Sequence, residues 1–143
     1  MKVLQHVVRN INEFNIPAGD PNAYEILYFG VNLILMFDYR LSLAIEVKNS
    51  NSEIEALIIS RKQVPAWKSH ANTEEYGKPY YSKRGVRVSD VFKPSISDAY
   101  VFILSNRCPC TEDCFKTKKV EVTLVHTWHQ EIKESQLRYR QQN

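Results

Sequence analysis

The fold is decided by a stretch of eight residues that reads Leu41-Ser42-Leu43-Ala44-Ile45-Glu46-Val47-Lys48. Large apolar side chains occupy every second position of this stretch, and small or charged side chains lie between them. Successive side chains of a β-strand point to opposite faces, so a period of two predicts a strand with one buried and one exposed face.

Similar patterns recur along most of the chain. Residues 33–40 alternate in the same way and lead into 41–48 either as one long bent strand or as two strands joined at a tight corner. Residues 99–104 are apolar on both faces, as in a central strand of a sandwich. We expect further strands at residues 3–16, 24–29, 53–60, 86–92 and 119–128. About seven to eight short strands with almost no helix predict an all-β fold, a single antiparallel β-sandwich of the jelly-roll kind.

Size and composition predict one globular domain. The chain has 143 residues, of which 43% are hydrophobic and 24% charged, and these values exclude wholesale disorder. We expect residues 1–143 to form a single domain with a polar C-terminal tail at 130–143. Polar residues near the N-terminus interrupt any signal peptide, and the longest apolar run, 33–37, is too short for a transmembrane segment. We therefore expect a cytoplasmic protein.

A family resemblance accompanies this pattern. In residues 92–107 a turn of small residues leads to an aromatic strand that ends at Asn106, and residues 118–122 begin a final alternating strand. This arrangement is similar to the C-terminal half of GOLD (Golgi dynamics) β-sandwich domains, although Asp98-Ala99 stands where that family usually has Gly. Residues 14–19 with 24–29 resemble the family's opening strand pair. The resemblance implies a sandwich that binds protein or lipid, not secretory trafficking.

Motifs of catalysis and of cofactor binding are absent from the sequence. It contains no glycine-rich phosphate loop, no G-x-S-x-G and no H-E-x-x-H. Its adjacent carboxylate pairs, Glu74-Glu75 and Glu112-Asp113, are more typical of solvated loops than of a hydrolytic site. We therefore expect no cofactor and no catalytic residue.

Three cysteines lie within seven residues, at Cys108, Cys110 and Cys114. With His126 they have the donor set of a zinc site. However, His126 lies six residues beyond Val120 on the expected strand, or about 20 Å away at about 3.3 Å per residue. Cys110 and Cys114 are alternatively the more plausible redox pair, since Cys108 and Cys110 would close a very tight ring. We favour free thiols, and a His126 that is hydrogen-bonded in the core.

The strongest candidate site is the aromatic-basic segment, residues 61–84, which we expect to be a long irregular loop. Residues 61–87 hold seven basic and two acidic side chains, a local net charge of +5. Such a mixture can stack nucleic-acid bases, lie on anionic lipid, or anchor a protein interface. Its aromatic residues can also simply cover an open edge of the sandwich. We predict binding to a protein partner through Trp67, Lys68, Tyr76, Lys78, Tyr80, Tyr81, Lys83 and Arg84.

Anionic lipid or nucleic acid is the alternative partner of this segment, and a metal- or redox-responsive role for the cysteines is an alternative function. Apolar edge strands, such as one expected at residues 33–37, also make a homo-oligomer possible, because unpaired strand edges can join two copies.

Overall fold

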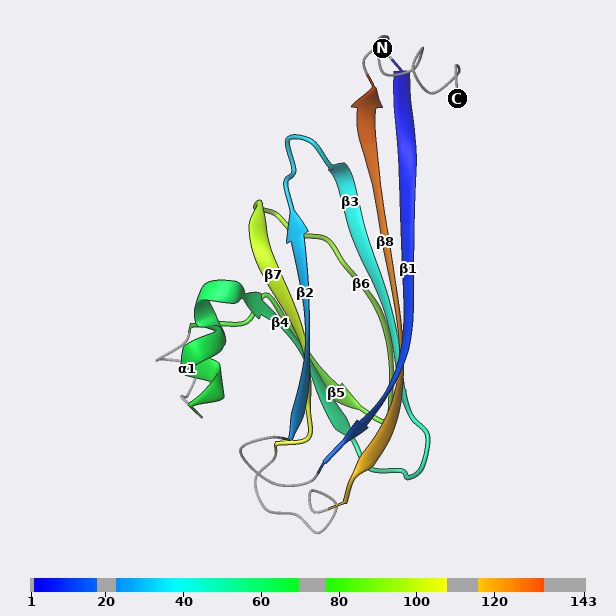
Figure 1. The fold of residues 1–143 in the computed structure, drawn as a ribbon, viewed down its shortest axis with the longest axis vertical. Helices are drawn as coiled ribbons and strands as arrows, with labels where there is room; N and C mark the ends of the chain where they lie inside the picture. Colours follow the sequence, from blue (N-terminus) through cyan, green and yellow to red (C-terminus); the bar gives the residue numbers. More distant parts are fainter. Residues whose placement is uncertain (1, 18–22, 70–76, 108–115, 133–143) are drawn as a thin grey trace.

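A computed structural model describes residues 2–17, 23–69, 77–107 and 116–132. In this part of the chain eight strands form two four-stranded antiparallel sheets that face each other (Figure 1). The strands are β1 (Lys2–Ile16), β2 (Tyr24–Val31), β3 (Phe37–Val47), β4 (Ile54–Ser60), β5 (Tyr81–Gly85), β6 (Arg87–Phe92), β7 (Asp98–Ser105) and β8 (Lys118–Ile132). Sheet A has the order β1-β8-β3-β6 and sheet B the order β2-β7-β4-β5. The predicted β-sandwich is confirmed.

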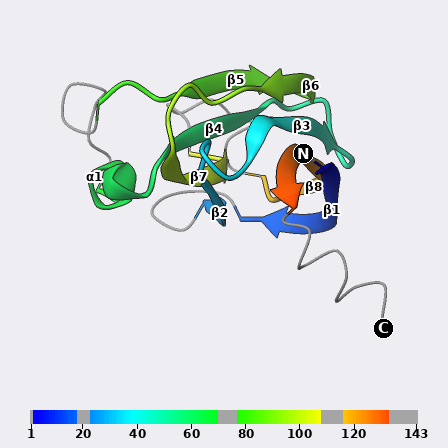
Figure 2. The same cartoon turned by 90° about the horizontal axis from the view of Figure 1, so that it is seen from above.

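The connectivity is that of a jelly roll. Strand β1 pairs with β8, β2 with β7, β3 with β6 and β4 with β5, so the chain folds back on itself as four nested antiparallel pairs. Alternate pairs lie in opposite sheets, and the two layers are seen edge-on in Figure 2. This nesting places the first and last described strands side by side in sheet A.

The main core lies between the sheets and follows the period of two. On β3 the side chains at every second position from Tyr39 to Val47 are buried, whereas those between them are exposed or partly exposed. They meet alternate residues of β4 and β7, which include Ile58 and Phe102. The strand predicted at 41–48 is therefore confirmed.

A second core lies on the outer face of sheet B. There a 3₁₀ turn, η1 (Arg61–Gln63), and a short helix, α1 (Val64–Lys68), cover the strands. Ser60 and Gln63 form a capping box, which satisfies backbone donors at the start of the turn, and Pro65 suits the first helical turn. This cluster consists of Leu57, Ile59, Val64, Trp67, Val101 and Ile103. The prediction that 61–84 is irregular throughout is wrong at both of its ends, since 81–84 belong to β5.

Residues 33–36 form a turn, so the strand predicted over 33–40 begins only at Phe37. The backbone N–H groups of Leu35 and Met36 donate to the carbonyl of Asn32, and Ile34 donates to the Asn32 side chain. A side chain that accepts from the backbone two residues on favours a turn even where its neighbours are apolar. The apolar edge strand expected at 33–37 is therefore not formed.

The last strand is longer than predicted, because β8 continues to Ile132 and pairs with β1 as far as Lys2. The predicted polar tail at 130–143 thus begins inside a strand, and residues 133–143 lie outside the described residues. Strands β1 and β8 extend together beyond the rest of the sandwich at the top of Figure 1.

Candidate interaction surfaces

The aromatic-basic segment does not form one continuous loop in the structure. Its beginning forms η1 and α1 over sheet B, and its end is the edge strand β5, which pairs with β4. Residues 77–80 connect to β5, whereas 70–76, including the predicted site residue Tyr76, lie outside the described residues. The residues of the predicted site therefore lie on different elements.

Trp67 is a core residue and not an exposed anchor. Its side chain is only 6% exposed, packs edge-to-face on Tyr24 with ring centroids 5.1 Å apart, and lies under the Arg107 guanidinium at 4.1 Å. Arg107 also donates to the Trp67 carbonyl over 3.0 Å. The neighbouring Lys68 is exposed, with its ammonium 6.0 Å from the Tyr24 ring centroid. Trp67 therefore fixes α1 on sheet B and has little surface left for a partner.

The tyrosines Tyr80 and Tyr81 point in different directions. Tyr81 packs on the main core, and its hydroxyl donates to Asp90 over 3.2 Å. Burial, and then the Asp90 carboxylate, raise the pKa of Tyr81 well above its usual range. Tyr80 is 41% exposed, its ring meets Tyr100 edge-on at 5.1 Å, and its hydroxyl donates to Asp98 over 3.2 Å. Of these two tyrosines, only Tyr80 offers a partner an exposed ring.

Two of the predicted cations on β5 have acidic partners. Lys83 lies 3.8 Å from Asp90, and Arg84 lies 3.4 Å from Glu53. Burial raises the pKa of Glu55, and the nearby Arg84 and then Arg107 act against this shift. The local positive charge of the segment is therefore partly neutralised within the fold.

Lys78 is exposed and lies two residues before Tyr80. Another exposed side chain near Tyr80, which the sequence analysis missed, is Ile96, at 49%. Ile96 belongs to the turn before β7, and its carbonyl accepts a hydrogen bond from the hydroxyl of Tyr100, the residue on which Tyr80 packs. The signal that could have revealed it is a single large apolar residue in an otherwise polar turn. We name Lys78, Tyr80 and Ile96 the Tyr80 patch.

His126 lies in the core, as predicted. It is 8% exposed, its Nδ1 is hydrogen-bonded to the Tyr39 hydroxyl, and the Phe29 ring meets it edge-on at 5.4 Å. Burial lowers the pKa of His126, so the neutral imidazole is favoured, and burial likewise raises the pKa of Tyr39.

The predicted metal or redox residues Cys108, Cys110 and Cys114 lie outside the described residues. The segment that contains them leaves from Asn106 and returns at Lys116, and these residues are joined by a hydrogen bond of 3.0 Å from Nδ2 of Asn106. His126 lies eight positions beyond Lys118, the first residue of β8, or about 26 Å along the strand at about 3.3 Å per residue. The described residues contain no group of three or more His, Cys, Asp or Glu side chains that could hold a metal ion.

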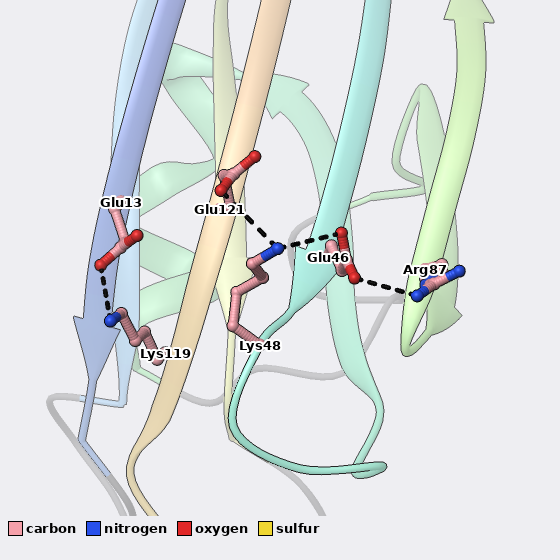
Figure 3. A network of polar contacts seen from close by, with 6 residues as sticks. All are labelled: Glu13, Glu46, Lys48, Arg87, Lys119 and Glu121. Atoms are coloured by element: carbon pink, nitrogen blue, oxygen red, sulfur yellow. Dashed lines mark ion pairs between the residues drawn. The ribbon is translucent and has the colours of Figure 1, made fainter.

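The outer face of sheet A has no helix over it in the described part of the chain, and a row of ion pairs crosses its lower end (Figure 3). Lys48 lies between Glu46, at 3.5 Å, and Glu121, at 3.9 Å, and Glu46 also contacts Arg87 at 3.1 Å. Next to this row, small side chains line a shallow open depression of about 400 Å³; they include Ser42, Ala44, Ser89 and Thr123. This face was not predicted as a site from the sequence.

Comparisons with known proteins bear only on the fold. No family model matches the chain, and neither does any curated protein. A solved structure described as "Bacillus endospore appendages form a novel family of disulfide-linked pili" is similar, with a TM-score of 0.56 and 10% sequence identity. The alignment covers 92% of this chain and 93% of the other. Within the described residues, no helix has the length and apolar character that a membrane crossing requires.

Proposed function

We propose that this chain is a non-catalytic binding module, and that it recognises a protein partner through the Tyr80 patch. The proposal narrows the predicted aromatic-basic segment to its exposed part, because Trp67 and Tyr81 are committed to the two cores. A GOLD-like character and a cytoplasmic location belong to the same proposal.

The observation that carries the proposal is the environment of Tyr80. Tyr80 is 41% exposed, yet its hydroxyl donates to Asp98 and its ring packs edge-to-face with the ring of Tyr100. A side chain fixed in this way loses little conformational entropy when a partner binds, and tyrosine is enriched among residues that dominate binding energy. Ile96 adds apolar surface beside it, and Lys78 adds positive charge.

A protein partner is favoured over a polyanion because Lys83 and Arg84 already have acidic partners. Binding to lipid headgroups or to nucleic acid relies on several free cations and weakens steeply with salt. We expect the purified chain to remain unbound to anionic vesicles and to single-stranded DNA at physiological salt. Sedimentation with vesicles and a gel-shift titration measure these two alternatives.

The test of the site is affinity capture of cellular proteins with the full chain, identified by mass spectrometry. We expect Tyr80→Ala to lose the captured partner while its circular dichroism stays unchanged. The matched control is Phe37→Ala, because Phe37 is 38% exposed and lies at the start of β3. The site is wrong if both variants recover the same partners as the unchanged chain.

The cysteines carry a second candidate function, a metal- or redox-responsive role, which three thiols within seven residues favour. Elemental analysis tests the metal version, and less than about a tenth of a zinc ion per chain rejects it, since a structural site binds one ion stoichiometrically. Electrophoresis without reductant tests the redox version. An oxidant-dependent shift that Cys114→Ser abolishes supports it, and an unchanged mobility rejects it. Covalent dimers in that gel would be a feature in common with the disulfide-linked pili named in the description of the similar solved structure.

A further inference from the structure

Among the described residues, strand β1 has a neighbouring strand on only one of its two edges. Its fifteen residues pair with β8 on one side, and within the described residues no strand pairs with its other side. A row of backbone N–H and C=O groups is therefore free to accept another strand. Proteins normally blunt such an edge with prolines, bulges or a short strand, but β1 is long, pairs with β8 in an unbroken register and contains no proline.

The outer face of β1 carries apolar side chains at a regular spacing. Val3, Val7 and Ile11 are 44%, 60% and 64% exposed and follow one another every four residues. Gln5 and Arg9 lie between them on the same face. The even-numbered residues of β1 are opposite the buried positions of β8 and face inward, so the odd-numbered residues face outward. An exposed apolar row of this kind on an open edge marks a surface that is covered in an assembly.

This row is self-complementary about Val7. A register of two antiparallel β1 strands can be described by the sum of the numbers of two directly opposite residues. When this sum is 14, Val7 faces Val7 of the second copy. Val3 then faces Ile11, and Gln5 faces Arg9. All three apolar side chains of the outward row thus meet apolar partners, which is the favourable cross-strand combination.

Neighbouring registers lose this match. A sum of 18 places Arg9 opposite Arg9, and like charges directly opposite each other are destabilising. A sum of 16 places Val7 opposite Arg9, and a sum of 12 places Val3 opposite Arg9. An odd sum would place an outward-facing residue of one copy opposite an inward-facing residue of the other, which an antiparallel ladder does not allow without a bulge. Only the sum of 14 gives all three apolar residues of this row an apolar partner.

We propose that two copies of this chain form a symmetric dimer in which β1 pairs antiparallel with β1 of the second copy, centred on Val7. The pairing joins two sheets A into one continuous eight-stranded sheet. A twofold interface of this kind is closed, because each copy uses the same edge and no further copy can add at that edge. The inference goes beyond the proposed binding function and uses a different part of the molecule from the Tyr80 patch.

The first test is the molar mass of the full chain, by light scattering or sedimentation, from about 1 μM to about 1 mM, a range that includes weak dimers. We expect a dimer whose dissociation constant Val7→Lys raises about tenfold or more, since it places two ammonium groups opposite each other. Val91→Lys is the matched control, because Val91 is a 50% exposed valine on the outer face of the other edge strand of sheet A. A monomer at every concentration overturns the proposal, and so does equal weakening by both variants.

The second test reads the register and does not depend on Val7→Lys folding well. Val7→Cys should form an intermolecular disulfide between residues 7, identified as a cross-linked peptide by mass spectrometry, because opposite residues lie within disulfide reach. Arg9→Cys should not cross-link to itself, because its symmetry mate would lie about four residues away, or about 13 Å. A link at residue 9 without one at residue 7 overturns the proposed pairing.

Discussion

The two sheets of the sandwich differ in how completely they are covered. In sheet B the inner face packs on the main core and the outer face lies under α1, so strand β7 is buried on both sides. In sheet A only the inner face is buried, and β8 alternates between buried and partly exposed residues. The period of apolar residues along a strand thus reports how many of its faces are covered, and not only that it is a strand.

The edges of the two sheets differ in the same sense. Strand β5 of sheet B has five residues and carries Lys83 and Arg84, two features that discourage pairing with another chain. Strand β1 of sheet A is three times as long, and Val7 and Ile11 are its most exposed large apolar residues. The β5 edge of sheet B therefore discourages association, whereas the β1 edge of sheet A is open to it.

The largest effect should come from uncovering sheet B. Trp67→Ala removes the side chain that fixes α1, and we expect the free energy of unfolding to fall by about 3–5 kcal/mol. Val91→Ala, on the uncovered face of sheet A, should change it by less than about 0.5 kcal/mol. Urea denaturation of both variants measures the difference. Equal losses would contradict the contrast between the sheets.

A smaller loss is expected at Gly77, which precedes β5 and has a φ of +86°. Gly77→Ala forces a side chain into the left-handed region, which costs about 1–2 kcal/mol. The new Cβ would also lie 2.9 Å from Nε2 of Gln63, whose side chain caps η1. Gly30→Ala is the control, since nothing lies within 4 Å of a Cβ there. Thermal or urea denaturation should show a loss for Gly77→Ala alone.

The pH dependence of stability tests the inner face of sheet A. Burial lowers the pKa of His126 below its ordinary value of 6.5, so the unfolded chain binds a proton there more readily than the folded one. The free energy of unfolding should therefore decrease as pH falls through 6.5, and level off below the folded pKa. The dependence should weaken in His126→Gln and persist in His129→Gln. Urea titrations between pH 8 and pH 5 measure it, and identical profiles for both variants would contradict this assignment.

The smallest effect is expected in the ion-pair row on the outer face of sheet A. Glu46→Ala removes the carboxylate that contacts Lys48 and Arg87, all of them at least one-third exposed. Exposed ion pairs contribute at most about 1 kcal/mol, and salt screens them. The stability difference from the unchanged chain should be small at low salt and should shrink at about 1 M NaCl. A loss that is insensitive to salt would indicate that Glu46 has a packing role.

The sandwich could be predicted well from the sequence, because the pattern that identifies each strand lies within that strand. The alternation at 41–48, the doubly apolar 99–104 and the buried His126 all follow from the period of side chains along single strands. Residues 33–36 were predicted wrongly because their apolar side chains alternate as in a strand, while the turn depends on hydrogen bonds to Asn32.

The candidate site was harder to predict, because exposure depends on which segments meet. Trp67 has the composition of a binding anchor, and only the presence of Tyr24 and Arg107 around it makes it a core residue. The positive charge of 61–87 suggested free cations, but Glu53 and Asp90, which pair with it, come from other strands or turns. In the sequence, the exposed apolar row of β1 has the same pattern as the buried face of a half-buried strand. Only the position of β1 at the edge of sheet A distinguishes the two.

The pairing of β1 with β8 also has a consequence for how the chain is made. Lys2 lies opposite Ile132 and Ile16 opposite Lys118, so β1 meets its neighbour only after β2 to β7 and then β8 have been synthesised. Contacts between such distant parts of a sequence slow folding. During translation β1 therefore stays without its native partner for longer than any other strand described here, with both of its edges exposed to other nascent chains.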